Sequence, residues 1–189
     1  MSKVSIIIPV YNGANYLSKA IDSALSQDYA DIEVIVINDG SNDENKTKNI
    51  ALSYGERIVY FEKNNGGVAS ALNLGITKMS GDYFSWLSHD DLYMPNKISS
   101  QLTFLNQQEN KTMKTIVYSD YELIDFNEKV LGQSKLAIHN IRSFRIWLTV
   151  HSSLNGCTLF ISKAAFDGNV KFNESLKDTQ DYDFWFSIA

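Results

Sequence analysis

Two adjacent aspartates, Asp90 and Asp91, are the residues of this sequence best suited to chemistry. They end the apolar run 83–89, which is typical of a buried strand, so they would emerge where that strand leaves its sheet. Neighbouring carboxylates repel each other and lose hydration on burial, and a divalent cation offsets both costs. Mg²⁺ and Mn²⁺ prefer such oxygen ligands and can also hold the phosphates of a substrate. An exposed acidic turn is the alternative interpretation of the pair.

Strand-like and helix-like segments alternate through the first half of the chain and would position this pair. Short β-branched runs predict strands buried on both faces, and apolar residues at helical spacing predict helices packed on a sheet. Repeated units of this kind imply a three-layer α/β/α sandwich with a mainly parallel central sheet. The expected strands are 4–10, 32–37, 58–61 and 83–89. Helices are expected at 17–25 and 68–79, and a polar helix capped by Ser41 or Asn42 should run to about Gly55. A fourth helix is expected after Pro95, with Ile98, Leu102 and Leu105 facing inward.

The loops after these four strands should meet at the carboxyl edge of the sheet, where such folds bind their ligands. They contain Tyr11, Asp39, the run 64–67 and the pair Asp90 and Asp91. One carboxylate there would mean little, because an Asp can simply shape a turn. Asp39 and the Asp90–Asp91 pair on the same edge indicate a binding site.

The pattern changes after residue 114, but no Pro- or Gly-rich linker marks a boundary, so we expect one compact unit. Its expected second half contains a strand at 115–119, a hairpin around Asn127 and Glu128, a helical stripe of Ile141, Phe144, Leu148 and His151, a strand at 156–161 and an amphipathic helix at 180–189.

Composition narrows the classes of function. The net charge of −5 argues against binding nucleic acid, whose partners usually carry a basic face, so any phosphate must be held locally. The only cysteine, Cys157, cannot form an internal disulfide, and its apolar neighbours favour a buried small side chain. There is no signal-peptide pattern and no apolar run near the roughly 20 residues of a membrane span. We therefore expect a soluble, cytoplasmic chain, and peripheral contact with the inner face of the membrane stays open.

Five ordered motifs resemble those of the family 2 glycosyltransferases. They are residues 4–12, 36–41, 65–76, 89–91 and 180–185, which together cover most of the chain. The resemblance implies a GT-A fold, a nucleotide-sugar-binding α/β domain. It also implies inverting transfer of a sugar from a nucleotide-sugar, with a UDP-sugar as the expected donor, in the synthesis of a cell-surface polysaccharide or glycolipid.

The same resemblance implies roles for single residues. Tyr11 would stack on or flank the base, and Asp39 would accept a hydrogen bond from a uracil-type imide. Asp90 would lie by the ribose and the metal, Asp91 would ligate the Mn²⁺ or Mg²⁺ that bridges the diphosphate, and Asp181 would be the general base. The expected nucleotide contacts are completed by Pro9, Asn12 and Gly67.

These roles agree with the chemistry of sugar transfer, in which charge grows on the departing diphosphate and a hydroxyl must lose its proton. The resemblance implies that residues 1–114 bind the nucleotide-sugar and that residues 115–189 serve the acceptor, a saccharide or lipid-linked saccharide. The family usually continues beyond the last motif, which implies that part of the acceptor side is missing. The oligomeric state is not indicated.

Three residues depart from the pattern of the family. Ser88 stands where many relatives carry a further Asp, and Gln180 stands where Glu is common, which leaves Asp181 as the base. Leu72 stands where many relatives carry Arg, so phosphate neutralisation would depend more on the metal or on Lys63.

Each assignment has a simpler alternative. Tyr11 could be a rim aromatic without a ligand, Gly66 and Gly67 could only shape a helix start, and Asp181 could be an ordinary acid of a helix N-terminus. For His89, a role in packing or in contacting a metal ligand is favoured over direct metal ligation. Interior positions are favoured over an acceptor site for Trp147 and His151.

Two other functions compete with glycosyl transfer. A nucleotidyltransferase would usually have a Gly-rich basic loop after the first strand, whereas residues 11–15 contain no Lys or Arg. A non-catalytic nucleotide-binding domain would bind UDP without transferring a sugar, and replacing Asp181 would change nothing.

Overall fold

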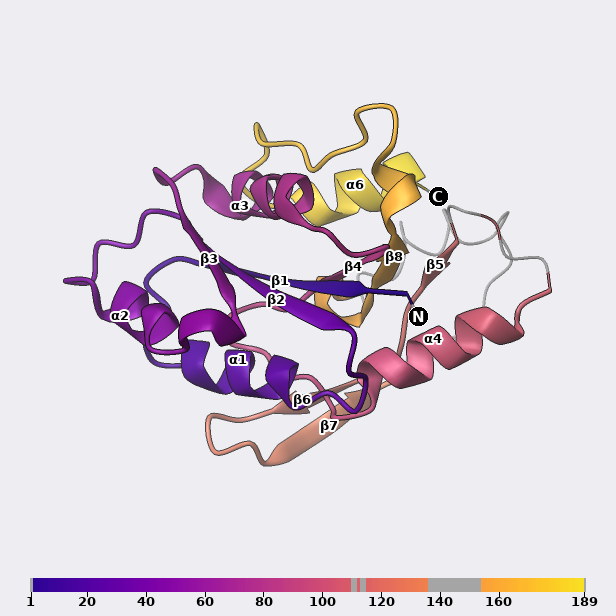
Figure 1. Ribbon diagram of the computed structural model, residues 1–189, viewed down its shortest axis with the longest axis horizontal. Coiled ribbons are helices and arrows are strands. Elements are labelled where there is room, and N and C mark those ends of the chain that lie inside the picture. Colours follow the sequence, from indigo (N-terminus) through magenta and orange to yellow (C-terminus); the bar gives the residue numbers. More distant parts are fainter. Residues whose placement is uncertain (1, 110–111, 113–114, 136–153, 189) are drawn as a thin grey trace.

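The polypeptide forms three layers, with a central sheet between two layers of helices, in the computed structural model shown in Figure 1. The structure describes residues 2–109, 112, 115–135 and 154–188. The expected helical stripe at 141–151, with Trp147 and His151, lies outside the described residues.

The central sheet has six strands in the order β3-β2-β1-β4-β8-β5. β1 pairs in parallel with β2 and β4, and β2 pairs in parallel with β3, which confirms the mainly parallel sheet. β8 runs antiparallel to both β4 and β5. The strand bounds are β1 Val4–Val10, β2 Ile32–Asn38, β3 Val59–Glu62, β4 Tyr83–Trp86, β5 Ile116–Val117 and β8 Phe160–Ser162.

The helices cover both faces of the sheet because each buries one apolar stripe against it. In Figure 1, α1, α2 and α4 lie on one side of the sheet, and α3 and α6 lie on the other. The inward residues expected for α4, namely Ile98, Leu102 and Leu105, are buried in the first of two hydrophobic clusters. The helix bounds are α1 Leu17–Leu25, α2 Lys46–Leu52, α3 Gly67–Lys78, α4 Lys97–Gln107 and α6 Gln180–Ile188.

The register of β1 and β2 fixes where the ligand-binding edge lies. All seven residues of β1 are buried, and Val10 at its end pairs with Asn38 at the end of β2. The amide N–H of Asp39 then donates to the carbonyl oxygen of Val10 at 2.8 Å. The loops that begin at Tyr11 and Asp39 therefore leave the sheet side by side.

Several expected elements begin or end elsewhere, among them the strand expected at 115–119, which covers only 116–117. Local hydrogen bonds explain two of these differences. α2 begins at Lys46 instead of directly after Ser41 or Asn42, because the Asp43 carboxylate accepts both the amide and the hydroxyl of Thr47. The expected strand 156–161 begins as the 3₁₀ helix η2 (Gly156–Thr158), because the side chain of Asn155 accepts the amide of Cys157. β4 ends at Trp86, so the run 87–89 already belongs to the loop.

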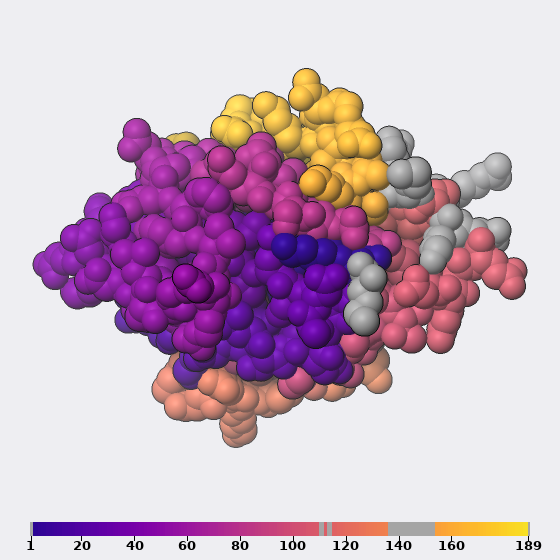
Figure 2. All heavy atoms as spheres, in the orientation of Figure 1, coloured from indigo at the N-terminus to yellow at the C-terminus, as the bar shows by residue number. Residues whose placement is uncertain are grey.

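A two-stranded hairpin, β6 (Tyr121–Ile124) and β7 (Val130–Ser134), projects from the sandwich. It confirms the turn expected around Asn127 and Glu128, and Figure 2 shows it along the lower edge of the molecule in orange. The Glu128 carboxylate pairs with Lys19 of α1 at 2.5 Å, which ties the hairpin to the first helix.

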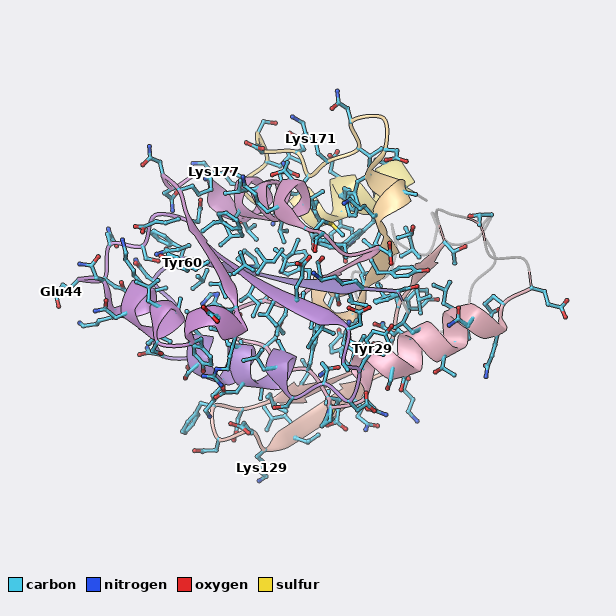
Figure 3. All side chains as sticks on the ribbon, viewed as in Figure 1. Tyr29, Glu44, Tyr60, Lys129, Lys171 and Lys177 are labelled. Carbon is cyan, nitrogen blue, oxygen red and sulfur yellow. The ribbon has the colours of Figure 1, made fainter. Side chains whose placement is uncertain are left out.

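Many charged side chains are exposed, as the cost of burying a charge favours. Figure 3 shows Glu44 and Lys129 at the outline of the molecule, and Lys171 and Lys177 are exposed as well. Within the described ranges, no helix is both long and apolar enough to span a bilayer.

Candidate active site

Asn12 joins the loops that follow β1 and β2. Its amide N–H donates to the Ser41 hydroxyl at 2.9 Å, and its side chain exchanges two hydrogen bonds of 2.8 Å with the side chain and backbone of Asn42. The backbone of Asn12 has φ +51°, a left-handed conformation that Asn tolerates better than most residues. Asn12 thus links the loop after β1, to which it belongs, with the loop after β2 and holds the two together.

Asp39 is the centre of a second set of contacts. This buried carboxylate accepts from the Lys63 ammonium group at 2.7 Å and from the amide N–H groups of Gly66 at 3.0 Å and Gly67 at 2.7 Å. Gly67 has φ +83°, which few residues other than glycine adopt readily. Asp39 therefore shapes the loop before α3, and Lys63, which the sequence offered for phosphate neutralisation, is paired with Asp39.

These loops enclose a cavity of about 440 Å³ at the carboxyl edge of the sheet. Its lining includes five of the six residues expected to contact the nucleotide: Pro9, Tyr11, Asp39, Gly67 and Asp90. The sixth, Asn12, lies outside this lining. Tyr11 lines the cavity with 44% of its surface exposed, so part of this side chain is accessible to a ligand. Residues from the four loops that follow β1, β2, β3 and β4 meet here, as expected, because the loops after parallel strands share one edge of the sheet.

Asp90 lies between this cavity and a smaller one of about 240 Å³. The smaller cavity lies between the Asp90–Asp91 pair and the hairpin, and Tyr16, Lys19 and Phe126 also line it. Asp90 is exposed, whereas Asp91 is partly buried. A ligand that extends from the larger cavity past Asp90 would thus meet both carboxylates.

Hydrogen bonds within the loop and to the end of β4 hold the loop that carries the two carboxylates. The amide N–H of Asp91 donates to the carbonyl oxygen of Ser88 at 3.1 Å, which closes a turn. The hydroxyl of buried Tyr93 donates to the carbonyl oxygen of Trp86 at 2.6 Å. Lys97, which is partly buried, donates to the Ser85 hydroxyl at 2.9 Å. Burial lowers the pKa of Lys97 to about 7.

Sequence reasoning missed the neighbour of Asp91. The thiol of Cys157 donates to the Asp91 carboxylate, with Sγ 2.9 Å from Oδ2. Burial raises the pKa of the Cys157 thiol, and the carboxylate beside it raises that pKa further, so the thiol keeps its proton. Burial also raises the pKa of Asp91, and the hydrogen bond from Cys157 opposes that shift. The sequence favoured a buried small side chain at Cys157, whereas the structure shows a partly buried residue whose thiol makes hydrogen bonds.

His89 lies against Gly13, so close that a Cβ on that glycine would be 2.3 Å from the imidazole Cδ2. This contact agrees with the packing role favoured for His89, although the side chain also lines the larger cavity. In the described part of the chain, no group of three or more His, Cys, Asp or Glu side chains is arranged to hold a metal ion. Asp90 and Asp91 alone could supply two oxygen ligands, so diphosphate and water would have to complete the coordination of Mn²⁺ or Mg²⁺.

Asp181 lies in the first turn of α6, on the α3 side of the sheet. Its carboxylate accepts the amide N–H of Tyr182 at 2.9 Å and is partly exposed. Asp181 lines neither of the two cavities described above. The structure therefore brings Asp39 and Asp90 to one cavity and leaves Asp181 in a different layer.

The position of α6 depends on an anchor that the motif 65–76 supplies. The side chain of Asn73 in α3 donates to the carbonyl oxygen of Phe172 at 2.9 Å and accepts its amide N–H at 3.0 Å. The ring of Phe172 stacks on Phe184 of α6, with centroids 4.2 Å apart. Asn73 thus connects α3 to the helix that carries Asp181.

Comparison with known proteins gives the family. The sequence profile described as glycosyl transferase family 2 matches residues 5–167 of this chain. The chain belongs to this family. A Rickettsia felis protein named as an uncharacterized glycosyltransferase is 53% identical over 98% of the chain, and GgaB of Bacillus subtilis, a minor teichoic acid biosynthesis protein, is 33% identical over 94%. The chain spans 31% and 20% of the lengths of these two family members.

Solved structures of glycosyltransferases confirm the GT-A fold. TarS of S. aureus, crystallised with UDP, superposes with a TM-score of 0.76 at 20% identity, covering 98% of this chain and 54% of that one. The mannosyltransferase PcManGT of Pyrobaculum calidifontis, solved with GDP-Man and Mn²⁺, gives a TM-score of 0.68 at 17% identity, covering 100% of this chain and 52% of that one.

Proposed function

We propose that this chain is the nucleotide-sugar-binding and catalytic part of an inverting glycosyltransferase. The observation that carries the proposal is the cavity that combines a rim aromatic, Tyr11, a buried carboxylate, Asp39, and the exposed carboxylate Asp90. An aromatic ring suits a base, and carboxylates beside it suit a metal–diphosphate group. Membership of glycosyl transferase family 2 supports the same reaction class.

The proposed donor is a UDP-sugar. Asp39 already accepts from one ammonium group and two amide N–H groups, yet two carboxylate oxygens offer about four acceptor positions. One further donor, such as the imide N–H of uracil, can be accommodated. TarS, a structural neighbour, was crystallised with UDP, which supports this choice, whereas the mannosyltransferase neighbour holds GDP-Man.

The proposed reaction is a single displacement at the anomeric carbon. The acceptor oxygen forms a bond to that carbon while the bond to the diphosphate oxygen breaks, and the electron pair leaves with the diphosphate. A divalent cation bound at Asp91 and Asp90 would neutralise the charge that the diphosphate gains. Asp181 takes the proton of the acceptor hydroxyl, which requires the acceptor to approach from the α6 side.

The proposed acceptor is a saccharide or lipid-linked saccharide of the cell surface. The similarity to GgaB, named for teichoic acid biosynthesis, supports an extracellular polymer as the final product. Because the chain spans a minority of that relative's length, segments outside it also contribute to acceptor choice in this proposal.

Binding of UDP and Mn²⁺ tests this function. We expect saturating UDP with Mn²⁺ to raise the midpoint of thermal unfolding by about 5–10 °C, since a ligand at 100 times its Kd adds about 2.7 kcal/mol. Asp91→Asn should remove most of the increase in the midpoint that depends on Mn²⁺. The increase that UDP causes without metal should stay. An unchanged midpoint in the wild-type chain with UDP, GDP or dTDP, each with Mn²⁺, would contradict the proposal.

A further inference from the structure

The sulfur of Cys157 bridges the two ends of the loop that carries the carboxylate pair. It accepts the amide N–H of Ser88 at 3.2 Å and donates its proton to Asp91 Oδ2 at 2.9 Å, with the Ser88 hydroxyl 3.3 Å away. The carboxylate is the natural recipient of the thiol proton, because it can only accept whereas a hydroxyl can do both. One atom thus fixes both the start and the end of the loop 88–91.

The sulfur is itself held firmly. Cys157 is the middle residue of η2, and the side chain of Asn155 accepts its amide N–H at 2.8 Å. A Cβ on the preceding residue, Gly156, would lie 2.2 Å from the indole of Trp86, so the turn presses directly on the end of β4. The hydrogen bond from Asn155 and the contact with Trp86 thus hold the turn that carries the thiol beside Asp91.

We propose that Cys157 is a positioning residue that orients the Asp91 carboxylate for a divalent cation. This inference rests on the proposed function, in which Asp91 is a metal ligand. A hydrogen bond to Oδ2 fixes the plane of the carboxylate, and partners of this kind around a ligand typically change metal affinity about 10-fold or more when they are removed.

Metal affinity measured apart from nucleotide affinity tests the role. We expect Cys157→Ala to weaken Mn²⁺ binding in the presence of UDP about 10-fold, because the carboxylate loses its partner. Cys157→Ser keeps a donor and should recover most of that loss. Both variants should bind UDP without metal as the wild type does. Thr158→Ser is the matched control, since it removes one methyl group from the same turn but keeps the hydroxyl, and its Mn²⁺ affinity should stay within twofold.

A purely structural role for Cys157 predicts a different pattern. Cys157→Ala would then lower the unfolding midpoint and would weaken UDP binding by the same factor with and without Mn²⁺. Cys157→Ser would restore neither the midpoint nor the affinity. Equal Mn²⁺ affinity of Cys157→Ala and the wild type would also overturn the inference.

Infrared spectroscopy gives a readout that needs no ligand. Cys157 is the only cysteine, so the S–H stretching band of the protein reports on this one thiol. The band should lie at the low frequency of a hydrogen-bonded thiol and should move toward the free value in Asp91→Ala, which removes the acceptor. A free-thiol band in the wild type would overturn the inference. A bonded thiol in a chain that binds neither UDP nor Mn²⁺ would instead refute the proposed function and, with it, the role in metal binding.

Discussion

Asp39 shows how one carboxylate can both shape a loop and offer a binding site. Its bonds to Lys63, Gly66 and Gly67 hold the loop before α3, which is the simpler role that sequence reasoning considered. The same carboxylate lines the larger cavity. A loop-shaping contact and a ligand contact are compatible because the two oxygens face several donors at once.

The role of Asp181 as the general base can be tested by a single substitution. Asp181→Asn should lower kcat about 10²- to 10⁴-fold, since the amide cannot accept the proton of the acceptor, while the Kd for UDP with Mn²⁺ stays unchanged. Asp183→Asn is the matched control, because Asp183 lies in the same helix and is exposed. Sugar-transfer assays paired with UDP titrations measure both quantities. Retained turnover in Asp181→Asn would remove this residue from the mechanism.

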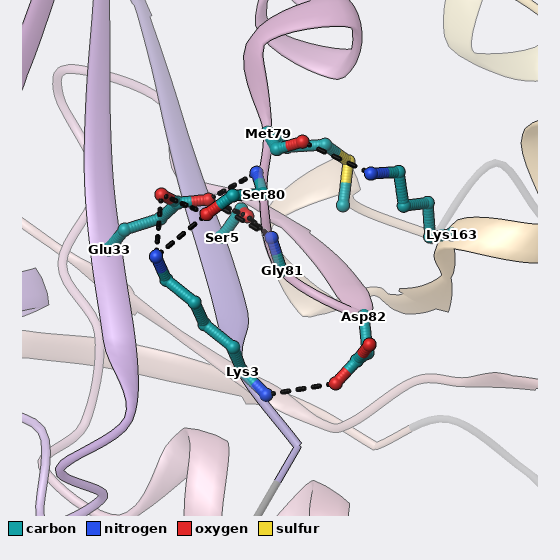
Figure 4. A network of polar contacts seen from close by, with 8 residues as sticks. All are labelled: Lys3, Ser5, Glu33, Met79, Ser80, Gly81, Asp82 and Lys163. Atoms are coloured by element: carbon teal, nitrogen blue, oxygen red, sulfur yellow. Dashed lines mark hydrogen bonds and ion pairs between the residues drawn. The ribbon is translucent and has the colours of Figure 1, made fainter.

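Among the elements, the amino-terminal ends of β1 and β2 and the loop before β4 share a polar network around Glu33 (Figure 4). The Glu33 carboxylate accepts from the hydroxyl of Ser5, from the amides of Ser80 and Gly81, and from Lys3 at 3.1 Å. These hydrogen bonds outweigh the opposing effect of burial and lower the pKa of Glu33 from 4.5 to about 2. The network thus ties three strands together at the edge opposite the site.

The low pKa of Glu33 predicts how stability depends on pH. A carboxyl group whose pKa is lower in the folded state stabilises the fold above its unfolded pKa of 4.5, and that contribution is lost as the pH falls toward 2. Glu33→Gln should therefore lower the free energy of unfolding by about 1–2 kcal/mol at pH 7, after allowance for solvent screening. The difference from the wild type should shrink between pH 4.5 and pH 2.

Urea unfolding at several pH values measures this effect. Asp31→Asn is a suitable control, because it removes a carboxylate from the segment that precedes the same strand. Its effect on stability should be smaller than that of Glu33→Gln at pH 7. A Glu33→Gln variant as stable as the wild type at pH 7 would show that the network contributes nothing net.

The elements were largely predictable because their patterns are local. The bounds expected for β1 and α1 match the structure, since a fully buried strand and an amphipathic helix each leave a clear periodic signal. Errors arose where a single side chain redirected the backbone, as Asp43 does at α2 and Asn155 does at η2. The contact between Cys157 and Asp91 could not be predicted, because it joins residues 66 positions apart and no periodicity records it.

For the whole molecule, one sheet unites both parts of the chain. β8 comes from the second part and pairs with β4 of the first, and β5 pairs with β8. The loop of Asp91 and the turn of Cys157 are therefore neighbours, although they are distant in sequence. The meeting of Tyr11, Asp39 and Asp90 at one cavity was predictable, because the loops after parallel strands share one edge of the sheet. Their contacts with a ligand stay predictions. The boundary at residue 114 and the acceptor role of the second part stay predictions, and so does the role of Asp181.

The most direct test of the account is a crystal structure of the chain with UDP and Mn²⁺, with the metal located by its anomalous scattering. We predict uracil beside Tyr11 and Asp39 in the larger cavity, and one Mn²⁺ peak within about 2.0–2.4 Å of a carboxylate oxygen of Asp91, bridging to the diphosphate. UDP bound away from this cavity, or Mn²⁺ bound without contact to Asp90 or Asp91, would contradict the account.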